Sequence, residues 1–262
     1  MGGSNSNNTN EIYDVLFVLQ VMTRQIACSE YNRYFVLKGG TAFMSMLMED
    51  DFDSYMRSTH DIDLHVCSED AWRSFKRNVV QVLNSNPYGV QYQVLSFKNR
   101  STTSDSITLQ AIYNGVTYKV KIDINVAPFS TITVTYLAST GMNAYDCETM
   151  MTDKISSICS QTVFRRSKDL YDMYVLSQLK QYTLSSLVSH LKCKRPTFFS
   201  QGVNMLVTQN YASLGHAYDK YRGILNKPSF YVLYKICSSF VYPFFNLSSV
   251  QRDLVWNGEY WV

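Results

Sequence analysis

The sequence lacks the features that mark several large classes of protein. No apolar run approaches the roughly 20 residues that a membrane-spanning helix needs. The six cysteines are scattered without a C-x-x-C pair, which argues against a zinc knuckle and against a disulfide framework. The net charge of +3 is too small to indicate a nucleic-acid-binding protein by itself. We therefore expect a cytoplasmic protein that does not contact membranes, in which most cysteines are buried and reduced.

The length and the order of sequence patterns predict the domain organisation. A chain of 262 residues can bury one sizeable core, or two modest ones that share an interface. Residues 1–10 are rich in Gly, Ser and Asn, lack a signal-peptide pattern and are predicted to be disordered. Helical and strand patterns are mixed over residues 11–140, whereas residues 141–262 are mainly helical in pattern. We predict a core domain followed by a helical C-terminal domain.

The periodicity of apolar residues predicts the individual elements. Helices are expected over residues 11–28, 42–48, 68–84, 146–160, 167–179, 183–191 and 229–240. Strands are expected over residues 34–37, 59–66, 90–97, 106–113 and 116–126. Asn114-Gly115 joins the last two strands as a hairpin turn. Thr41 and Ser68 are expected to cap the helices that follow them.

Two aspartates stand in the alternating run from Thr59 to Val66. Side chains of a strand alternate between its two faces, so Asp61 and Asp63 share a face while the apolar residues between them point into a core. Two neighbouring carboxylates repel each other unless a cation, such as a divalent metal ion, lies between them. Acidic strand residues are also common at solvated surfaces, and the pair alone is weak evidence for a metal site.

A glycine turn lies about twenty residues before the aspartates, at Lys38-Gly39-Gly40-Thr41. Backbone N–H groups at such a turn can contact phosphates. A Gly-Gly pair is often only a tight turn, and the Gly-Lys-Ser/Thr ending of a Walker loop is missing. Its position before the aspartate strand makes it informative, because phosphate-binding amides and metal-binding carboxylates together suggest nucleotidyl transfer.

A third aspartate, Asp123, lies in the predicted strand 116–126. It shares the polar face of that strand with Lys119, Lys121 and Asn125, and the opposite face is apolar. Asp123 is therefore a candidate third carboxylate for the same metal site.

The pair His60-Asp61 suggests an alternative, a metal-dependent phosphohydrolase. That chemistry requires several more histidine ligands with suitable spacing. The other histidines, His65, His190 and His216, form no such pattern. His60 and His65 are better explained as polar neighbours of the carboxylates or as surface residues.

A charged cluster follows between Lys154 and Asp172, and includes Arg165, Lys168 and Asp169. On a helix, Asp169 and Asp172 lie one turn apart, with Lys168 four residues before Asp172. An ordinary solvated helix face with a salt bridge explains this spacing. The alternative is that Lys154 and a neighbouring cation face a triphosphate.

A short basic run, Lys192-Cys193-Lys194-Arg195, precedes two phenylalanines, Phe198 and Phe199. Such a segment can contact an RNA backbone or stack on a base. Short basic runs are also common on any protein surface.

The ordered set of glycine turn, aspartate pair, Lys154 and Arg165–Asp172 cluster resembles the AbiEii/AbiGii nucleotidyltransferase toxins, which include MenT-type toxins. The resemblance implies an α/β (α+β) fold: a DNA polymerase β-like nucleotidyltransferase core with a mixed sheet, followed by a helical C-terminal domain. Residues 180–262 carry no family signal.

The resemblance also implies roles for individual residues. Catalytic and metal-binding roles, with Mg²⁺ or Mn²⁺ as the ion, fall on Asp61, Asp63 and Asp123, and a further catalytic role falls on Lys154. Nucleotide binding falls on Lys38, Gly39, Gly40, Thr41, Arg165, Lys168, Asp169 and Asp172.

The same resemblance implies that the substrate is an NTP and that the acceptor is the 3′ end of tRNA. The protein would be the toxin of a toxin–antitoxin or phage-defence system, with a separately encoded cognate antitoxin as its partner. Two alternatives stay open: transfer of the nucleotide to a protein hydroxyl or a small molecule, and a nucleotide-binding module without catalytic activity.

Overall fold

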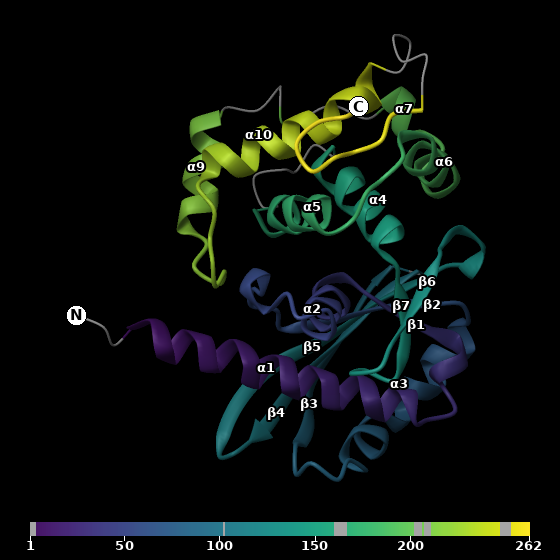
Figure 1. Ribbon diagram of the computed structural model, residues 1–262. Coiled ribbons are helices and arrows are strands. Elements are labelled where there is room, and N and C mark those ends of the chain that lie inside the picture. Colours follow the sequence, from purple (N-terminus) through teal and green to yellow (C-terminus); the bar gives the residue numbers. More distant parts are fainter. Residues whose placement is uncertain (1–3, 102, 160–166, 202–205, 207–210, 247–252) are drawn as a thin grey trace. The chain divides into compact units, whose positions relative to one another are not determined.

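The computed structural model describes the chain except for residues 1–3, 102, 160–166, 202–205, 207–210 and 247–252 (Figure 1). The chain divides into two units, which are described separately here. Unit 1 consists of Met1–Ser130, Val134–Tyr145 and Gly223–Leu225. Unit 2 consists of Thr131–Thr133, Asp146–Arg222 and Asn226–Val262.

Unit 1 is built on a mixed sheet whose seven described strands have the order β3-β4-β5-β2-β1-β7-β6. The strands are β1 (Phe35–Lys38), β2 (Asp61–Val66), β3 (Gln91–Ser101), β4 (Ser104–Tyr113), β5 (Val116–Val126), β6 (Val134–Leu137) and β7 (Met142–Tyr145). The pairs β2–β5 and β1–β7 are parallel, and the other neighbouring pairs are antiparallel. The two short strands β6 and β7 are not predicted from the sequence.

The described α-helices of unit 1 are α1 (Ser4–Ala27), α2 (Gly39–Glu49) and α3 (Glu69–Asn84). Helix α1 begins seven residues before the predicted helix and takes in most of the segment that the sequence predicts to be disordered. The Ser68 side chain accepts a hydrogen bond from the backbone N–H of Ala71, which confirms its predicted capping role. The predicted cap at Thr41 is wrong, because α2 begins at Gly39 with Lys38 as its N-cap residue.

The two faces of the sheet differ in chemistry, as the alternating sequence predicts. Ile62, Leu64 and Val66 have exposed fractions of 0% and lie in the core. Helices α1 and α3 lie on this apolar face (Figure 1): the Tyr92 hydroxyl donates to the Val18 carbonyl, and Trp72 Nε1 donates to Asp105 Oδ2 at 2.9 Å. The opposite face carries the polar residues of β2 and β5.

Unit 2 is helical. Its described α-helices are α4 (Cys147–Ile158), α5 (Ser167–Leu179), α6 (Leu184–Lys194), α7 (Phe198–Gln201), α9 (Tyr211–Lys220) and α10 (Phe230–Val241). The bounds predicted for α5 are confirmed, and those for α4, α6 and α10 are correct to within three residues. Helix α9 is not predicted; it packs closely on α10, since a Cβ at Gly215 would lie 2.9 Å from the Phe230 ring.

The C-terminal segment of unit 2 packs against its helices. Trp256 is fully buried, and its indole N–H donates to the Ser177 carbonyl at 2.8 Å. The Trp256 ring also contacts Phe240 and Trp261. Across the part of the chain that is described, no helix has the length and apolar character required to cross a bilayer.

Candidate active site

Three aspartates project from the polar face of the sheet in unit 1. The parallel register of β2 and β5 pairs Asp63 with Asp123, and Asp61 with Lys121. Register partners on neighbouring strands project from the same face, and the strands lie about 4.8 Å apart. All three aspartates are partly exposed. The structure therefore brings the predicted carboxylates Asp61, Asp63 and Asp123 onto one accessible face.

The start of α2 lies directly against one of these carboxylates. Gly39 has a φ of +70°, and a Cβ at this position would lie 2.1 Å from Asp63 Oδ2. A Cβ at Gly40 would lie 2.6 Å from Thr59 Oγ1. Both glycines are therefore required for close packing, and Gly39 is also required for the positive φ of the turn. The first N–H groups of a helix have no partner within the helix, so this end of α2 suits an anion such as phosphate.

Two threonines fix the position of Asp61. Thr41 Oγ1 donates to the Asp61 carbonyl at 2.6 Å, and Thr59 Oγ1 donates to Asp61 Oδ1 at 3.1 Å. The side chain of Thr41, predicted to contact phosphate, thus connects α2 to β2. Thr59 was not singled out from the sequence, although its place two residues before Asp61 puts it on the same face if the extended conformation continues.

Two lysines accompany the carboxylates. Lys38 is the register partner of Asp63 on β1, and Lys121 Nζ forms an ion pair with Asp123 Oδ2 at 2.5 Å. The sequence pattern places Lys121 only on the same strand face as Asp123, because the parallel pairing that brings it beside Asp61 is not visible in the sequence. Positive charges here offset part of the repulsion among the three carboxylates.

The donor chemistry of this face fits a hard divalent cation, since carboxylate oxygens are the ligands that Mg²⁺ prefers. Within the described residues, no three His, Cys, Asp or Glu side chains are gathered closely enough to hold a metal ion as they stand. The metal-binding roles of Asp61, Asp63 and Asp123 therefore stay predictions.

The His65 side chain is buried and has a structural role. It has an exposed fraction of 4%, and its two ring nitrogens lie 2.6 Å from the Tyr145 hydroxyl and 2.8 Å from the Ala127 carbonyl. A carbonyl only accepts, so Nε2 carries a proton and, in the neutral ring, Nδ1 accepts from Tyr145. Of the two alternatives predicted for His65, the surface position is wrong, whereas the position on the same strand face as Asp61 and Asp63 agrees with the register of β2 and β5.

The charged cluster of unit 2 forms an ion triad with one buried and two partly exposed members. Lys154 Nζ on α4 lies 2.8 Å from Asp169 Oδ1 and 2.7 Å from Asp172 Oδ2 on α5. The side chain of Asp172 has an exposed fraction of 0%. Lys168 instead lies over the Tyr221 ring, 5.6 Å from its centroid, and Arg165 lies outside the described residues. The structure thus brings Lys154, Asp169 and Asp172 together and places Lys168 elsewhere.

The basic run before Phe198 is partly structural. Lys194 Nζ forms an ion pair with Asp153 Oδ1 at 2.5 Å, and Phe198 has an exposed fraction of 6%. Lys192 and Arg195 are exposed. Contact of this segment with RNA stays a prediction, and only these exposed basic residues are placed to make it.

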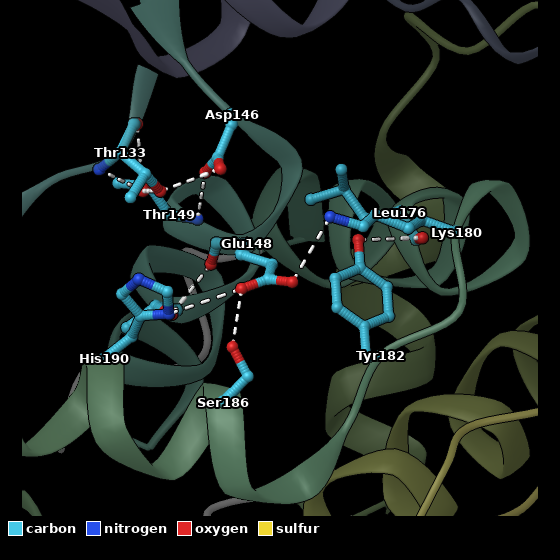
Figure 2. Close-up of polar contacts among 10 residues, drawn as sticks. Thr133, Asp146, Glu148, Thr149, Leu176, Lys180, Tyr182, Ser186 and His190 are labelled. Carbon is cyan, nitrogen blue, oxygen red and sulfur yellow. Dashed lines mark hydrogen bonds and ion pairs between the residues drawn. The ribbon is translucent and has the colours of Figure 1, made fainter. Parts of the chain in front are cut away.

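A polar network around Glu148 connects helices α4 and α6 of unit 2 (Figure 2). The carboxylate of Glu148 accepts a hydrogen bond from Ser186 Oγ at 2.7 Å, and it lies 3.3 Å from Lys180 Nζ and 3.5 Å from His190 Nδ1. Sequence reasoning missed this network, because its members are distant in the chain and follow no motif. Its contacts with side chains from neighbouring elements indicate a structural role.

Asp146 caps α4 beside this network (Figure 2). Its carboxylate accepts from the backbone N–H of Thr149 at 2.8 Å and from Thr133 Oγ1 at 2.7 Å. Burial raises the pKa of Asp146, but these hydrogen bonds outweigh it and the net pKa is lowered. Asp146 is therefore ionised at neutral pH, which suits a carboxylate at a helix N-terminus.

The mixed sheet, the helix that starts at the glycine pair and the aspartates beside it form the arrangement that the sequence predicts for a nucleotidyltransferase. The sequence-family model for the AbiEii nucleotidyl transferase toxins of type IV toxin–antitoxin systems matches residues 20–214, about three quarters of the chain. The chain belongs to this family, and the resemblance and fold class predicted from the sequence are confirmed. The enzyme class is confirmed as well.

Solved structures agree on the fold. JHP933 from Helicobacter pylori is similar with a TM-score of 0.52 at 15% identity, over 92% of this chain and 94% of the other. A second solved structure, named as a putative nucleotidyltransferase from H. pylori, is similar with a TM-score of 0.57 at 15% identity, over 92% of this chain and 99% of the other. No curated protein sequence matches this chain.

Proposed function

We propose that this nucleotidyltransferase transfers a nucleoside monophosphate from an NTP to the 3′ end of tRNA in a reaction that depends on Mg²⁺. It would act as the toxin of a toxin–antitoxin pair in phage defence, with a cognate antitoxin as its partner. The observation that carries the proposal is the placement of Asp61, Asp63 and Asp123 on one face, with Asp63 packed against Gly39 at the start of α2.

The residues of unit 1 have distinct parts in this proposal. Asp61 and Asp63 would hold Mg²⁺ or Mn²⁺, with Asp123 as the third ligand. Such an ion neutralises charge on the phosphates during in-line transfer. The N–H groups at the start of α2 and the Lys38 ammonium would bind the triphosphate. Asp123 would also accept the proton of the attacking hydroxyl.

The proposed roles of unit 2 residues rest on the family. On the family's pattern, nucleotide binding is also assigned to Lys154, Arg165, Lys168, Asp169 and Asp172. In the structure, the ion triad of Lys154, Asp169 and Asp172 joins α4 to α5 and holds the Lys154 ammonium in one place.

The test is incubation of the purified protein and Mg²⁺ with each α-labelled NTP in turn, against total RNA, total protein and small acceptors. We expect label in the tRNA fraction, and loss of that label on adding EDTA. Asp63→Asn should abolish incorporation, whereas the matched control Asp70→Asn, an exposed aspartate in the first turn of α3, should retain it. Label in protein or in small acceptors instead of tRNA would refute tRNA as the acceptor. Full activity of Asp63→Asn would refute the proposed role of the aspartates.

A further inference from the structure

The polar face of the sheet continues well beyond the carboxylates. Pairing across five strands places one residue from each in a single row: Lys98 on β3, Ser106 on β4, Asp123 on β5, Asp63 on β2 and Lys38 on β1. The row is continuous from the start of α2 to the edge strand β3. At about 4.8 Å per strand, Lys98 lies on a strand roughly 10 Å from that of Asp123.

Two further rows run parallel to the first. One joins Ser96, Thr108, Lys121 and Asp61, and the other joins Gln93, Gln110 and Lys119. The first two residues of each row lie on β3 and β4. Leu95 is an extra residue in β3 at a register shift, so both rows remain on the same face of the sheet.

The charge of this face changes sign along the rows. Among the described residues of β3, β4 and β5 on this face, Asp123 is the only acidic residue. The others include lysines, hydroxyls and amides, which are the groups that contact nucleic-acid phosphates and sugars. Lys98, Lys119, Ser96 and Gln93 are exposed. The surface beyond the carboxylates is therefore basic, polar and accessible.

Ser106 marks the place where this surface meets the carboxylates. It is the register partner of Asp123, its exposed fraction is 1%, and within the described residues its Oγ has no hydrogen-bond partner. Buried hydroxyls usually have a partner in the folded protein or in a ligand. A free donor and acceptor beside Asp123 suits the hydroxyl-bearing end of an acceptor.

We infer that the polar face of β3, β4 and β5 is the acceptor track, a surface that binds the sugar–phosphate backbone of a single-stranded RNA end. The track leads the terminal hydroxyl to Asp123. This inference rests on the proposed transfer to RNA, and adds to it the side from which the acceptor approaches. The lysines of the track match a polyanion, and the lack of an exposed aromatic side chain in the three rows favours binding of backbone over stacking of bases.

The test compares the double variant Lys98→Glu/Lys119→Glu with Arg77→Glu. Arg77 is an exposed cation on α3, which lies on the apolar face of the sheet, so this control alters charge away from the track. RNA binding is measured by fluorescence anisotropy with deacylated tRNA over a series of salt concentrations. Loss of the two lysines should weaken binding by about tenfold or more and reduce the salt slope by about 1.4, at about 0.7 per phosphate contact.

Steady-state kinetics provide the second readout. The double variant should raise the KM for tRNA while the KM for NTP and the kcat at saturating tRNA stay near those of the wild type. A merely structural defect would change all three, and circular dichroism checks the fold. If the double variant and the Arg77→Glu control have equal tRNA affinity and equal KM for tRNA, the acceptor track is refuted. The proposed RNA acceptor would still stand in that case, provided that the wild type labels RNA. Wild-type protein that labels only protein acceptors would refute the proposed RNA acceptor and the track together.

Discussion

Substitution of Gly39 by alanine tests the contact between the glycine turn and Asp63. The new Cβ would lie 2.1 Å from Oδ2, 2.8 Å from Cγ and 2.9 Å from Cβ of Asp63, so the carboxylate has to rotate away. The φ of +70° adds about 1–2 kcal/mol of strain for a residue with a Cβ. A misplacement of about 1 Å near reacting groups costs about a hundredfold in rate. We therefore expect kcat for nucleotide incorporation to fall by about a hundredfold or more.

Gly89→Ala is the matched control. Gly89 has a φ of +73°, and nothing lies within 4 Å of a Cβ there, so this variant has the backbone strain without the collision. Gly89→Ala should lose about 1–2 kcal/mol of unfolding free energy, measured by urea denaturation, and Gly39→Ala at least as much, but only Gly39→Ala should lose activity. Incorporation by Gly39→Ala within a few-fold of the control would show that Asp63 does not need its observed position.

Three further predictions concern other parts of the chain. Lys154→Met should destabilise the protein by about 3–5 kcal/mol in urea denaturation, because it removes an ion-pair partner of the buried carboxylate of Asp172; unchanged stability would contradict the ion triad. Burial raises the pKa of Asp105, but hydrogen bonds from α3 and from a backbone N–H lower it overall, below 3.8. The ionised Asp105 carboxylate therefore stabilises the fold above pH 3.8, and this stabilisation is lost as the pH falls through the lowered pKa. Asp105→Asn should therefore make the free energy of unfolding fall less steeply with decreasing pH in the acidic range. An equally steep fall in the variant and the wild type would refute the role of Asp105. Thr59→Val should reduce kcat/KM by about tenfold through loss of one hydrogen bond to Asp61, and unchanged kinetics would show that this bond does not position the carboxylate.

Local patterns predicted much of the fold. Alternation in β2 and β5 correctly placed Ile62 and Ile122 in the core and put the aspartates on the other face. Asn114-Gly115 correctly predicted a hairpin, with Asn114 at a φ of 51°. These predictions succeed because strand alternation and turn chemistry are determined by residues close together in the chain.

Other features depend on pairing between distant segments and were not predicted. Strands β6 and β7 have only four residues each, too few for a clear alternating pattern. The position of Lys121 beside Asp61 follows from the parallel register of β2 and β5, and the sequence does not specify this register. The hydrogen bond from Thr41 to the Asp61 carbonyl likewise depends on how α2 packs beside β2.

Binding of Mn²⁺ in the presence of a non-hydrolysable NTP analogue tests the central claim most directly. Electron paramagnetic resonance titration would compare the wild type with the variant Asp61→Asn/Asp63→Asn. We predict that the wild type binds the ion and that the variant binds it more than about a hundredfold more weakly, since even outer-shell changes cost about 10–100-fold. Equal affinity in the two proteins would contradict the assignment of these carboxylates as the metal-binding centre of the enzyme.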